Sequence, residues 1–127
     1  MVDTKGIHLI LDIWDAAPTS LSDLEYVKST LLDATRKAGA TIIGYKFHRF
    51  QPAGISGIVL IAESHISIHT WPDKGYASVD IYTCGNKCFP DEAKSKILEA
   101  FRAQKADLTR IERGLASSKE MQIVKGE

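Results

Sequence analysis

The sequence has few cysteines and no long apolar run, and each of these absences excludes a class of protein. Two cysteines in 127 residues are too few for a disulfide-dense secreted scaffold, and we expect Cys84 and Cys88 to be thiols. No apolar stretch approaches the roughly 20 residues that cross a bilayer, so we expect no membrane partner. The first residues lack the charged and apolar regions of a signal peptide, which favours a cytoplasmic location.

The chain also lacks an excess of charge of either sign. Its 16 basic and 16 acidic side chains balance, and no run of five basic residues exists. Nucleic acid is therefore not an expected partner. A chain of 127 residues suits a single domain, 1–127, because at this size about two-thirds of the surface can be buried without disulfides.

The hydrophobic pattern predicts an α+β fold. Short β-branched and apolar runs bounded by glycine and proline indicate strands. The motif Ser22-x-x-Glu25 is typical of a capping box before a first helix, which Gly39 ends, and Pro90 begins a second helix. The predicted strands are 7–14, 41–50, 57–62, 66–70, 76–83 and 106–112.

Six strands and two helices in this order predict a mostly antiparallel sheet with both helices on one face. The strands nevertheless carry bulky apolar residues on both faces, since Ile10 and Trp14 alternate with Leu9, Leu11 and Ile13. The face without helices needs a partner. We expect a homodimer in which two sheets stack as an α/β/β/α sandwich.

Reactive side chains concentrate between residues 54 and 85. Strand alternation places His65, Ser67 and His69 on one face, and Ser64 lies at the start of that strand beside Glu63. Core strands usually fill such positions with valine, isoleucine and leucine. The cluster therefore indicates a functional site.

Each of these residues also has a structural interpretation when it is taken singly. Ser64 is a residue type common in turns, His69 suits a half-buried structural histidine, and Cys84 suits a small core position. Phe50 and Trp71 are as consistent with packing or a dimer interface as with ligand contact.

A zinc site is a further interpretation of the histidines and cysteines. His65 and His69 could join Cys84 and Cys88 as nitrogen and sulfur ligands. The two histidines lie on one strand, however, and the usual rise separates them by about 13 Å. One ion cannot bridge that distance, and we expect no metal.

Three runs carry a resemblance to a known family. They are 63–72 (Glu-Ser-His-Ile-Ser-Ile-His-Thr-Trp-Pro), 47–50 (Phe-His-Arg-Phe) followed by Gly-Ile-Ser-Gly at 54–57, and 75–85 (Gly-Tyr-Ala-Ser-Val-Asp-Ile-Tyr-Thr-Cys-Gly). In order and spacing they resemble the prokaryotic S-adenosylmethionine decarboxylases, over residues 6–114. A match of this length is far more specific than one short motif.

The resemblance implies a proenzyme that cleaves itself between Glu63 and Ser64, giving a β chain 1–63 and an α chain 64–127. The Ser64 hydroxyl attacks the carbonyl of Glu63, and Ser64 ends as a pyruvoyl group, which is the cofactor. His69 matches the base of this processing. Ser56 matches a residue that supports the carbonyl under attack.

The resemblance also implies how the substrate reacts. The substrate amine forms a Schiff base with the pyruvoyl group, which takes up the electrons released with carbon dioxide. Cys84 matches the donor that protonates the resulting carbanion. Phe50 matches an aromatic residue that stacks on adenine, and Trp71 lies where a ring can face the sulfonium. The product is the aminopropyl donor of spermidine synthesis, a step of polyamine biosynthesis.

Two departures from the family pattern keep other functions open. Ile7 stands where many members have arginine, and Asp12 stands where glutamate is expected. Relatives of this fold decarboxylate arginine or ornithine with the same machinery, which makes a basic amino-acid decarboxylase the alternative. The match through Phe50 and Trp71 favours S-adenosylmethionine. A third interpretation is an unprocessed binding subunit for an active partner, and the intact Glu63-Ser64 pair speaks against it.

Overall fold

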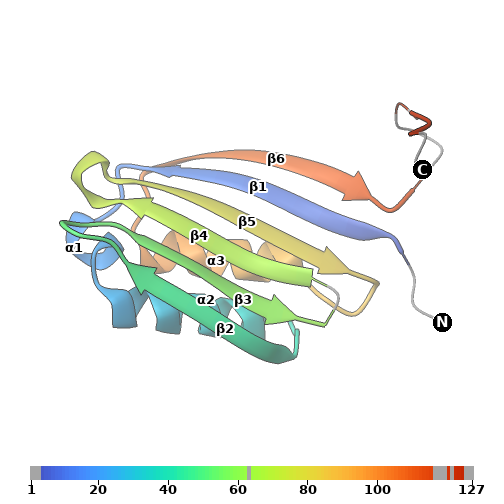
Figure 1. Ribbon diagram of the computed structural model, residues 1–127, viewed down its shortest axis with the longest axis horizontal. Helices are drawn as coiled ribbons and strands as arrows, with labels where there is room; N and C mark the ends of the chain where they lie inside the picture. The colour runs from blue at the N-terminus through green and yellow to red at the C-terminus, as the bar shows by residue number, and fades with distance from the viewer. Residues whose placement is uncertain (1–3, 63, 116–119, 121, 125–127) are drawn as a thin grey trace.

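The computed structural model describes residues 4–62, 64–115, 120 and 122–124, which form a sheet with helices behind it (Figure 1). The sheet has the order β2-β3-β4-β5-β1-β6, and each neighbouring pair of strands is antiparallel. The predicted α+β fold is therefore confirmed. The strands are β1 (Gly6–Trp14), β2 (Ile42–Arg49), β3 (Ile55–Ile61), β4 (Ser64–Trp71), β5 (Tyr76–Cys84) and β6 (Lys105–Arg113).

The helices α1 (Pro18–Leu21), α2 (Leu24–Lys37) and α3 (Pro90–Ala100) all lie on one face of the sheet (Figure 1). The prediction of two helices is wrong by one, because the described residues contain α1 as well. Its four residues are too few to show a helical period. Within the described part of the chain, no helix is long and apolar enough to span a membrane.

The start of α2 differs from the predicted capping box by one residue. Asp23 is the N-cap, and its carboxylate accepts a hydrogen bond of 3.1 Å from the Tyr26 backbone N–H. The Ser22 hydroxyl instead donates to the Pro18 carbonyl at 3.1 Å, at the end of α1. The capping-box prediction at Ser22 and Glu25 is therefore wrong, because a helix that the pattern did not reveal ends at Ser22.

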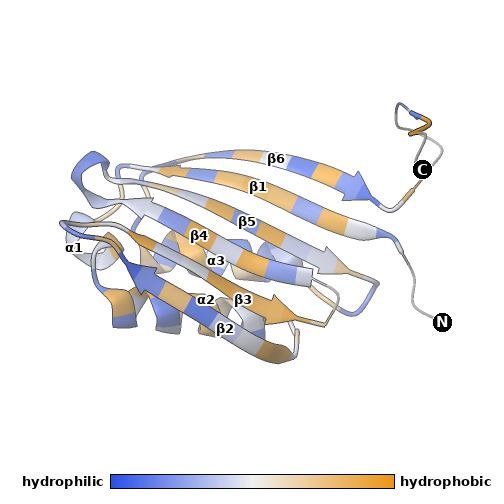
Figure 2. Cartoon of the chain, in the orientation of Figure 1, coloured by the Kyte–Doolittle hydropathy of each residue, from blue (hydrophilic) through white to orange (hydrophobic). Residues whose placement is uncertain are grey.

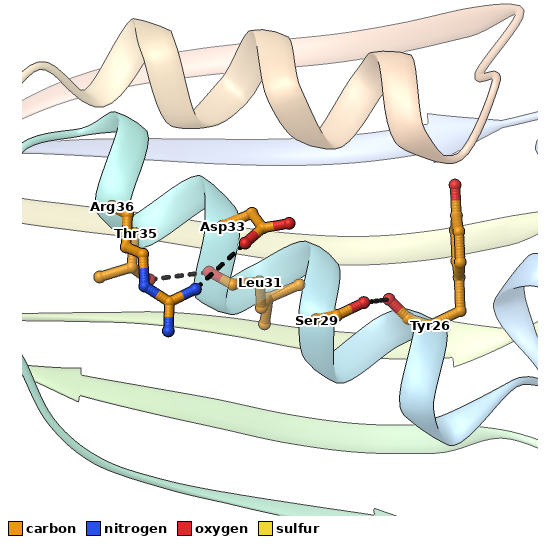
Figure 3. A network of polar contacts seen from close by, with 6 residues as sticks. All are labelled: Tyr26, Ser29, Leu31, Asp33, Thr35 and Arg36. Atoms are coloured by element: carbon orange, nitrogen blue, oxygen red, sulfur yellow. Dashed lines mark hydrogen bonds and ion pairs between the residues drawn. The ribbon is translucent and has the colours of Figure 1, made fainter.

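Polar side chains on α2 bond within the helix itself (Figure 3). The buried stripe of the helix, which includes Val27 and Leu31, packs in the core, and the Thr35 hydroxyl on that stripe is satisfied within the helix. The pairs are Ser29 with the Tyr26 carbonyl at 3.2 Å, Thr35 with the Leu31 carbonyl at 2.8 Å, and Arg36 with Asp33 at 3.1 Å.

The core lies between the sheet and the helices. Leu9, Leu11 and Ile13 of β1 point into it and are at most 1% exposed, whereas Ile10 and Trp14 point the other way and are 36% and 41% exposed. Apolar and polar bands accordingly alternate along the strands (Figure 2). The face of the sheet away from the helices, called the outer face below, is bare in a single chain. It carries large apolar side chains.

Strand β4 follows the same alternation. Ile66, Ile68 and Thr70 are buried toward the helices. The Thr70 hydroxyl donates to the Leu21 carbonyl at 2.8 Å and accepts from the Ile55 N–H at 3.0 Å. This buried hydroxyl therefore fixes the start of β3 against the end of β4. Ser56 and His69, two of the predicted site residues, pair with each other there.

Candidate active site

Ser64 is the first residue of β4, at one end of the sheet. It pairs with Ile61 of β3, so the chain reverses direction within two residues. The Ser64 hydroxyl donates to the Ala62 carbonyl at 3.3 Å, and the residue is half-buried. Glu63, the other half of the predicted cleavage site, lies outside the described residues.

Cys84 lies at the same end of the sheet as Ser64. The predicted strand 76–83 stops one residue before it, but Cys84 is the last residue of β5, which pairs with β4. Ser64 and Cys84 line one cleft of about 210 Å³, together with Lys87 and Cys88. Burial, followed by the nearby Cys84, raises the pKa of the Cys88 thiol, which therefore stays protonated at neutral pH.

Ser56 and His69 form a pair near the other end of β4. They are direct partners across β3 and β4, and Ser56 Oγ lies 2.7 Å from His69 Nδ1. This hydrogen bond fixes the orientation of the imidazole ring and leaves its Nε2 available. A base held in this way can accept a proton from a group brought within hydrogen-bond distance.

Phe50 and Trp71 are the aromatic neighbours of this pair. Both rings line a cleft of about 260 Å³ that also contains Gly54, Ser56 and His69. The Phe50 and Trp71 side chains are 48% and 45% exposed, so neither residue is part of the core. Large rings left open beside a histidine form a surface that suits a flat heterocycle or an organic cation.

The chain folds over Gly54 to close this cleft. Gly54 has a φ of +104°, a conformation that L side chains rarely adopt. A Cβ at this position would lie 3.2 Å from the Thr70 carbonyl oxygen. Glycine thus allows residues 50–55 to turn close to β4, and the Phe50 N–H bonds to the Gly54 carbonyl at 2.8 Å.

The structure separates the predicted site residues into two groups within one chain. Ser64 begins β4 and His69 follows five residues later on the same strand. At about 3.3 Å per residue their Cα atoms lie about 16 Å apart. Their nearness in the sequence predicts a single site. The structure groups Ser64 with Cys84, and His69 with Ser56, Phe50 and Trp71.

The remaining histidines and cysteines show no metal-binding arrangement. Among the residues that the structure describes, no group of three or more His, Cys, Asp or Glu side chains could hold an ion. His65 instead lies near Tyr82 on the outer face, with ring centroids 5.8 Å apart. Burial lowers the pKa of His65, so its ring is neutral at pH 7.

One polar cluster near Ser64 escaped the sequence analysis. His8 Nε2 lies 2.9 Å from an Asp80 carboxylate oxygen, and the Arg113 guanidinium lies over the Tyr82 ring, 4.6 Å from its centroid. These residues come from β1, β5 and β6. The alternation of β5 puts Asp80, Tyr82 and Cys84 on one face and was a usable signal, but the neighbours on β1 and β6 depend on strand order.

The antiparallel sheet with helices on one face, and a serine and a thiol in one cleft at its end, define an α+β protein that carries a nucleophile beside a proton donor. Comparisons with known proteins identify the family. The family model described as S-adenosylmethionine decarboxylase matches residues 7–114. An S-adenosylmethionine decarboxylase proenzyme of Thermodesulfovibrio yellowstonii is 48% identical over 112 residues, which are 88% of this chain and 83% of that protein. One of Pyrococcus abyssi is 41% identical over 119 residues, 94% of this chain and 86% of that protein.

A solved structure agrees. The adenosylmethionine decarboxylase of Aquifex aeolicus superposes with a TM-score of 0.83 at 34% identity, over 92% of this chain and 97% of that one. The chain therefore belongs to the S-adenosylmethionine decarboxylase family. The resemblance stated from the sequence is confirmed, and the arginine or ornithine alternative is not favoured.

Proposed function

We propose that this chain is a self-processing, pyruvoyl-dependent S-adenosylmethionine decarboxylase that matures by cleavage between Glu63 and Ser64 into chains 1–63 and 64–127. The observation that carries the proposal is the placement of Ser64 at the start of β4, in one cleft with Cys84, in a chain of this family. Relatives that are named proenzymes support the cleavage step.

Ser64 acts first as a nucleophile. Its hydroxyl oxygen bonds to the carbonyl carbon of Glu63, and the C–N bond breaks, so that the peptide becomes an ester. A base then removes the Ser64 α-proton, and the Glu63 carboxylate leaves with the ester oxygen. The remaining dehydroalanine hydrolyses and releases ammonia, which leaves a keto group at residue 64. A serine hydroxyl is a weak nucleophile, and the Ser64 α-proton is removed only by a base, so both steps need an assisting group. We assign the role of base to His69 and the support of the Glu63 carbonyl to Ser56.

The end of the sheet that holds Ser64 fits a group made from that residue. The cleft there is about 210 Å³ and the Cys84 thiol lines it. The pyruvoyl group supplies an electron sink for the loss of carbon dioxide. Cys84 protonates the substrate carbon that loses the carboxylate, since a protonated thiol can act as a general acid. Phe50 and Trp71 hold the adenine and the sulfonium.

A homodimer reconciles these roles with the distance between the two groups of residues. His69 cannot reach Ser64 of its own chain across about 16 Å. A two-fold axis that lies between two stacked outer faces, and runs across the strands, places the start of one β4 against the end of the other. Each active site then combines Ser64 and Cys84 of one protomer with Ser56, His69, Phe50 and Trp71 of its partner.

The apolar side chains of the outer face support this dimer. Ile10, Trp14 and Leu60 are 36%, 41% and 50% exposed in the single chain. Burying side chains of this size stabilises an interface by about 25 cal/mol for each Å² of apolar surface removed from water. We infer that stacking of the sheets both covers this face and completes the two sites.

The experiment measures carbon dioxide released from carboxyl-labelled S-adenosylmethionine, arginine and ornithine. The processed protein is expected to act on S-adenosylmethionine, and a Ser64→Ala variant to remain one chain without activity. Release from arginine or ornithine alone would move the proposal to the alternative substrate class. Activity in the uncleaved Ser64→Ala chain would exclude the pyruvoyl mechanism.

A further inference from the structure

Tyr82 stands directly beside the proposed proton donor. It lies on the outer face of β5, two residues before Cys84. Its hydroxyl would lie 3.3 Å from a Cβ on Gly6, and Gly6 is the direct cross-strand partner of Cys84, so the hydroxyl comes close to the Cys84 side chain. β5 is flanked by β4 and β1, so this contact lies inside the sheet and away from its edges (Figure 1).

The ring of Tyr82 is held on several sides. Gly6 of β1 leaves room for it, because a Cβ there would lie 2.7 Å from Tyr82 Cε1. The Arg113 guanidinium covers the ring at 4.6 Å from its centroid. The rings of His8 and His65 lie with centroids 5.5 Å and 5.8 Å away. A tyrosine confined in this way presents its hydroxyl in one direction.

We propose that Tyr82 is the positioning residue of the proton donor: its hydroxyl donates to the sulfur of Cys84 and aims the S–H at the substrate carbon. This inference rests on the proposed function. A thiol sulfur that accepts a hydrogen bond keeps its own proton for transfer. When that proton leaves, the sulfur becomes a thiolate, and the same hydrogen bond becomes charge-assisted and stronger. The contact therefore favours the transfer step over the resting state.

Tyr82 remains a donor over the working pH range. The hydrogen bond to Cys84, followed by burial, raises the pKa of Tyr82 above its ordinary value of 10.0. The charged and titratable groups that face it are Cys84 on its own strand, His8 on β1, His65 on β4 and Arg113 on β6. His8 in turn contacts Asp80. Arg113 acts in the opposite direction and lowers the pKa of Tyr82.

The role predicts where a proton goes when the hydroxyl is missing. If Cys84 is misdirected, the proton can reach the carbon of residue 64 instead of the substrate carbon. The substrate nitrogen then stays on residue 64, which becomes alanine, and hydrolysis releases the decarboxylated remainder as an aldehyde. The enzyme molecule is lost, and its α chain carries a new free amino group.

The test compares Tyr82→Phe with Tyr45→Phe, which removes the hydroxyl of an exposed tyrosine on β2, outside the proposed site. For Tyr82→Phe we expect complete cleavage at Glu63-Ser64, an unchanged KM and a kcat about tenfold lower, the effect of losing one hydrogen bond to a group that becomes charged. We also expect at least a tenfold rise in amine-labelled α chain for each product formed. A structural role alone would not change that ratio.

A second variant covers the case in which Tyr82→Phe fails to fold. Gly6→Ala keeps the hydroxyl but displaces the ring, and the ratio of labelled α chain to product is expected to rise as well. The inference is wrong if either variant processes and folds but partitions like Tyr45→Phe. An inactive, uncleaved wild-type chain would instead overturn the proposed function, so the two failures are distinguishable.

Discussion

Co-expression of a Ser64→Ala chain with a His69→Ala chain is expected to restore cleavage of the His69→Ala chain. Neither variant should process alone, because one lacks the nucleophile and the other lacks the base. In a mixed dimer, however, Ser64 of the His69→Ala protomer meets the intact His69 of its partner. The other site of the same dimer carries both changes and stays silent.

The expected yield follows from the geometry and from symmetry. Ser64 and His69 are five residues apart on β4, and about 3.3 Å per residue puts them about 16 Å apart within a chain. Rescue therefore requires two chains. Random pairing at equal expression puts about half of all chains in mixed dimers, so about half of the His69→Ala chains are expected to be cleaved. Carbon dioxide release should be about a quarter of the wild-type value per chain, since one site in four is intact.

Different tags on the two chains allow mixed dimers to be isolated and the cleaved chain to be identified by mass. The matched control co-expresses Ser56→Ala with His69→Ala. Both changes lie in the same half of the site, so no mixed dimer contains an intact site, and no rescue is expected. The account of a shared site fails if isolated mixed dimers of Ser64→Ala and His69→Ala stay uncleaved, or if His69→Ala cleaves by itself at the wild-type rate.

Three further predictions concern the stability of the fold and the substrate cleft. Thr70→Val removes a buried hydroxyl that is hydrogen-bonded to the Leu21 carbonyl and the Ile55 N–H. In a Ser64→Ala background, urea unfolding should show a free energy of unfolding lower by about 3 kcal/mol. An unchanged free energy would mean that water replaces the hydroxyl as the partner of both groups. Phe50→Ala should raise KM for S-adenosylmethionine about fivefold with little change in kcat, because a stacking ring contributes about 1 kcal/mol. An unchanged KM would leave Phe50 without substrate contact. The hydrogen bond from Arg110 is the main cause that lowers the pKa of Asp91, so Arg110→Gln should destabilise the fold near pH 7. The difference in unfolding free energy between this variant and wild type should vanish as the pH falls through the lowered pKa of Asp91. A difference that persists at low pH would contradict this origin.

The sign of the last effect follows from linkage. A carboxylate whose pKa is lower in the folded state stabilises the fold at pH values above its unfolded pKa. That stabilisation disappears as the carboxylate is protonated in the folded state, below its ordinary pKa of 3.8. Asp91 and Arg110 are both about half-exposed, so solvent screening keeps the effect modest.

Alternation made the strands predictable from the sequence. The buried faces of β1 and β4 follow the period of two that Leu9, Leu11 and Ile13, and then Ile66 and Ile68, set out. The short helix α1 was missed because four residues carry no period, and its presence moved the cap of α2 from Ser22 to Asp23. Local signals thus located elements but not these boundaries.

The site residues were recognisable by type and spacing, whereas their grouping was not. Nearness in sequence suggested one site for Ser64 and His69, but an extended strand carries them apart. The partners of Tyr82 depended on the strand order, because β1 adjoins β5 and β6 lies on the far side of β1. Long-range strand order is a tertiary property, which single-sequence patterns do not specify.

The intact mass of the freshly purified wild-type protein, measured under denaturing conditions, tests the central claim most directly. The account predicts two fragments, residues 1–63 and residues 64–127, the second without a free amino terminus because residue 64 has become a pyruvoyl group. A single full-length mass that persists in folded, dimeric protein would contradict self-processing, and the interpretation as an unprocessed binding subunit would replace it.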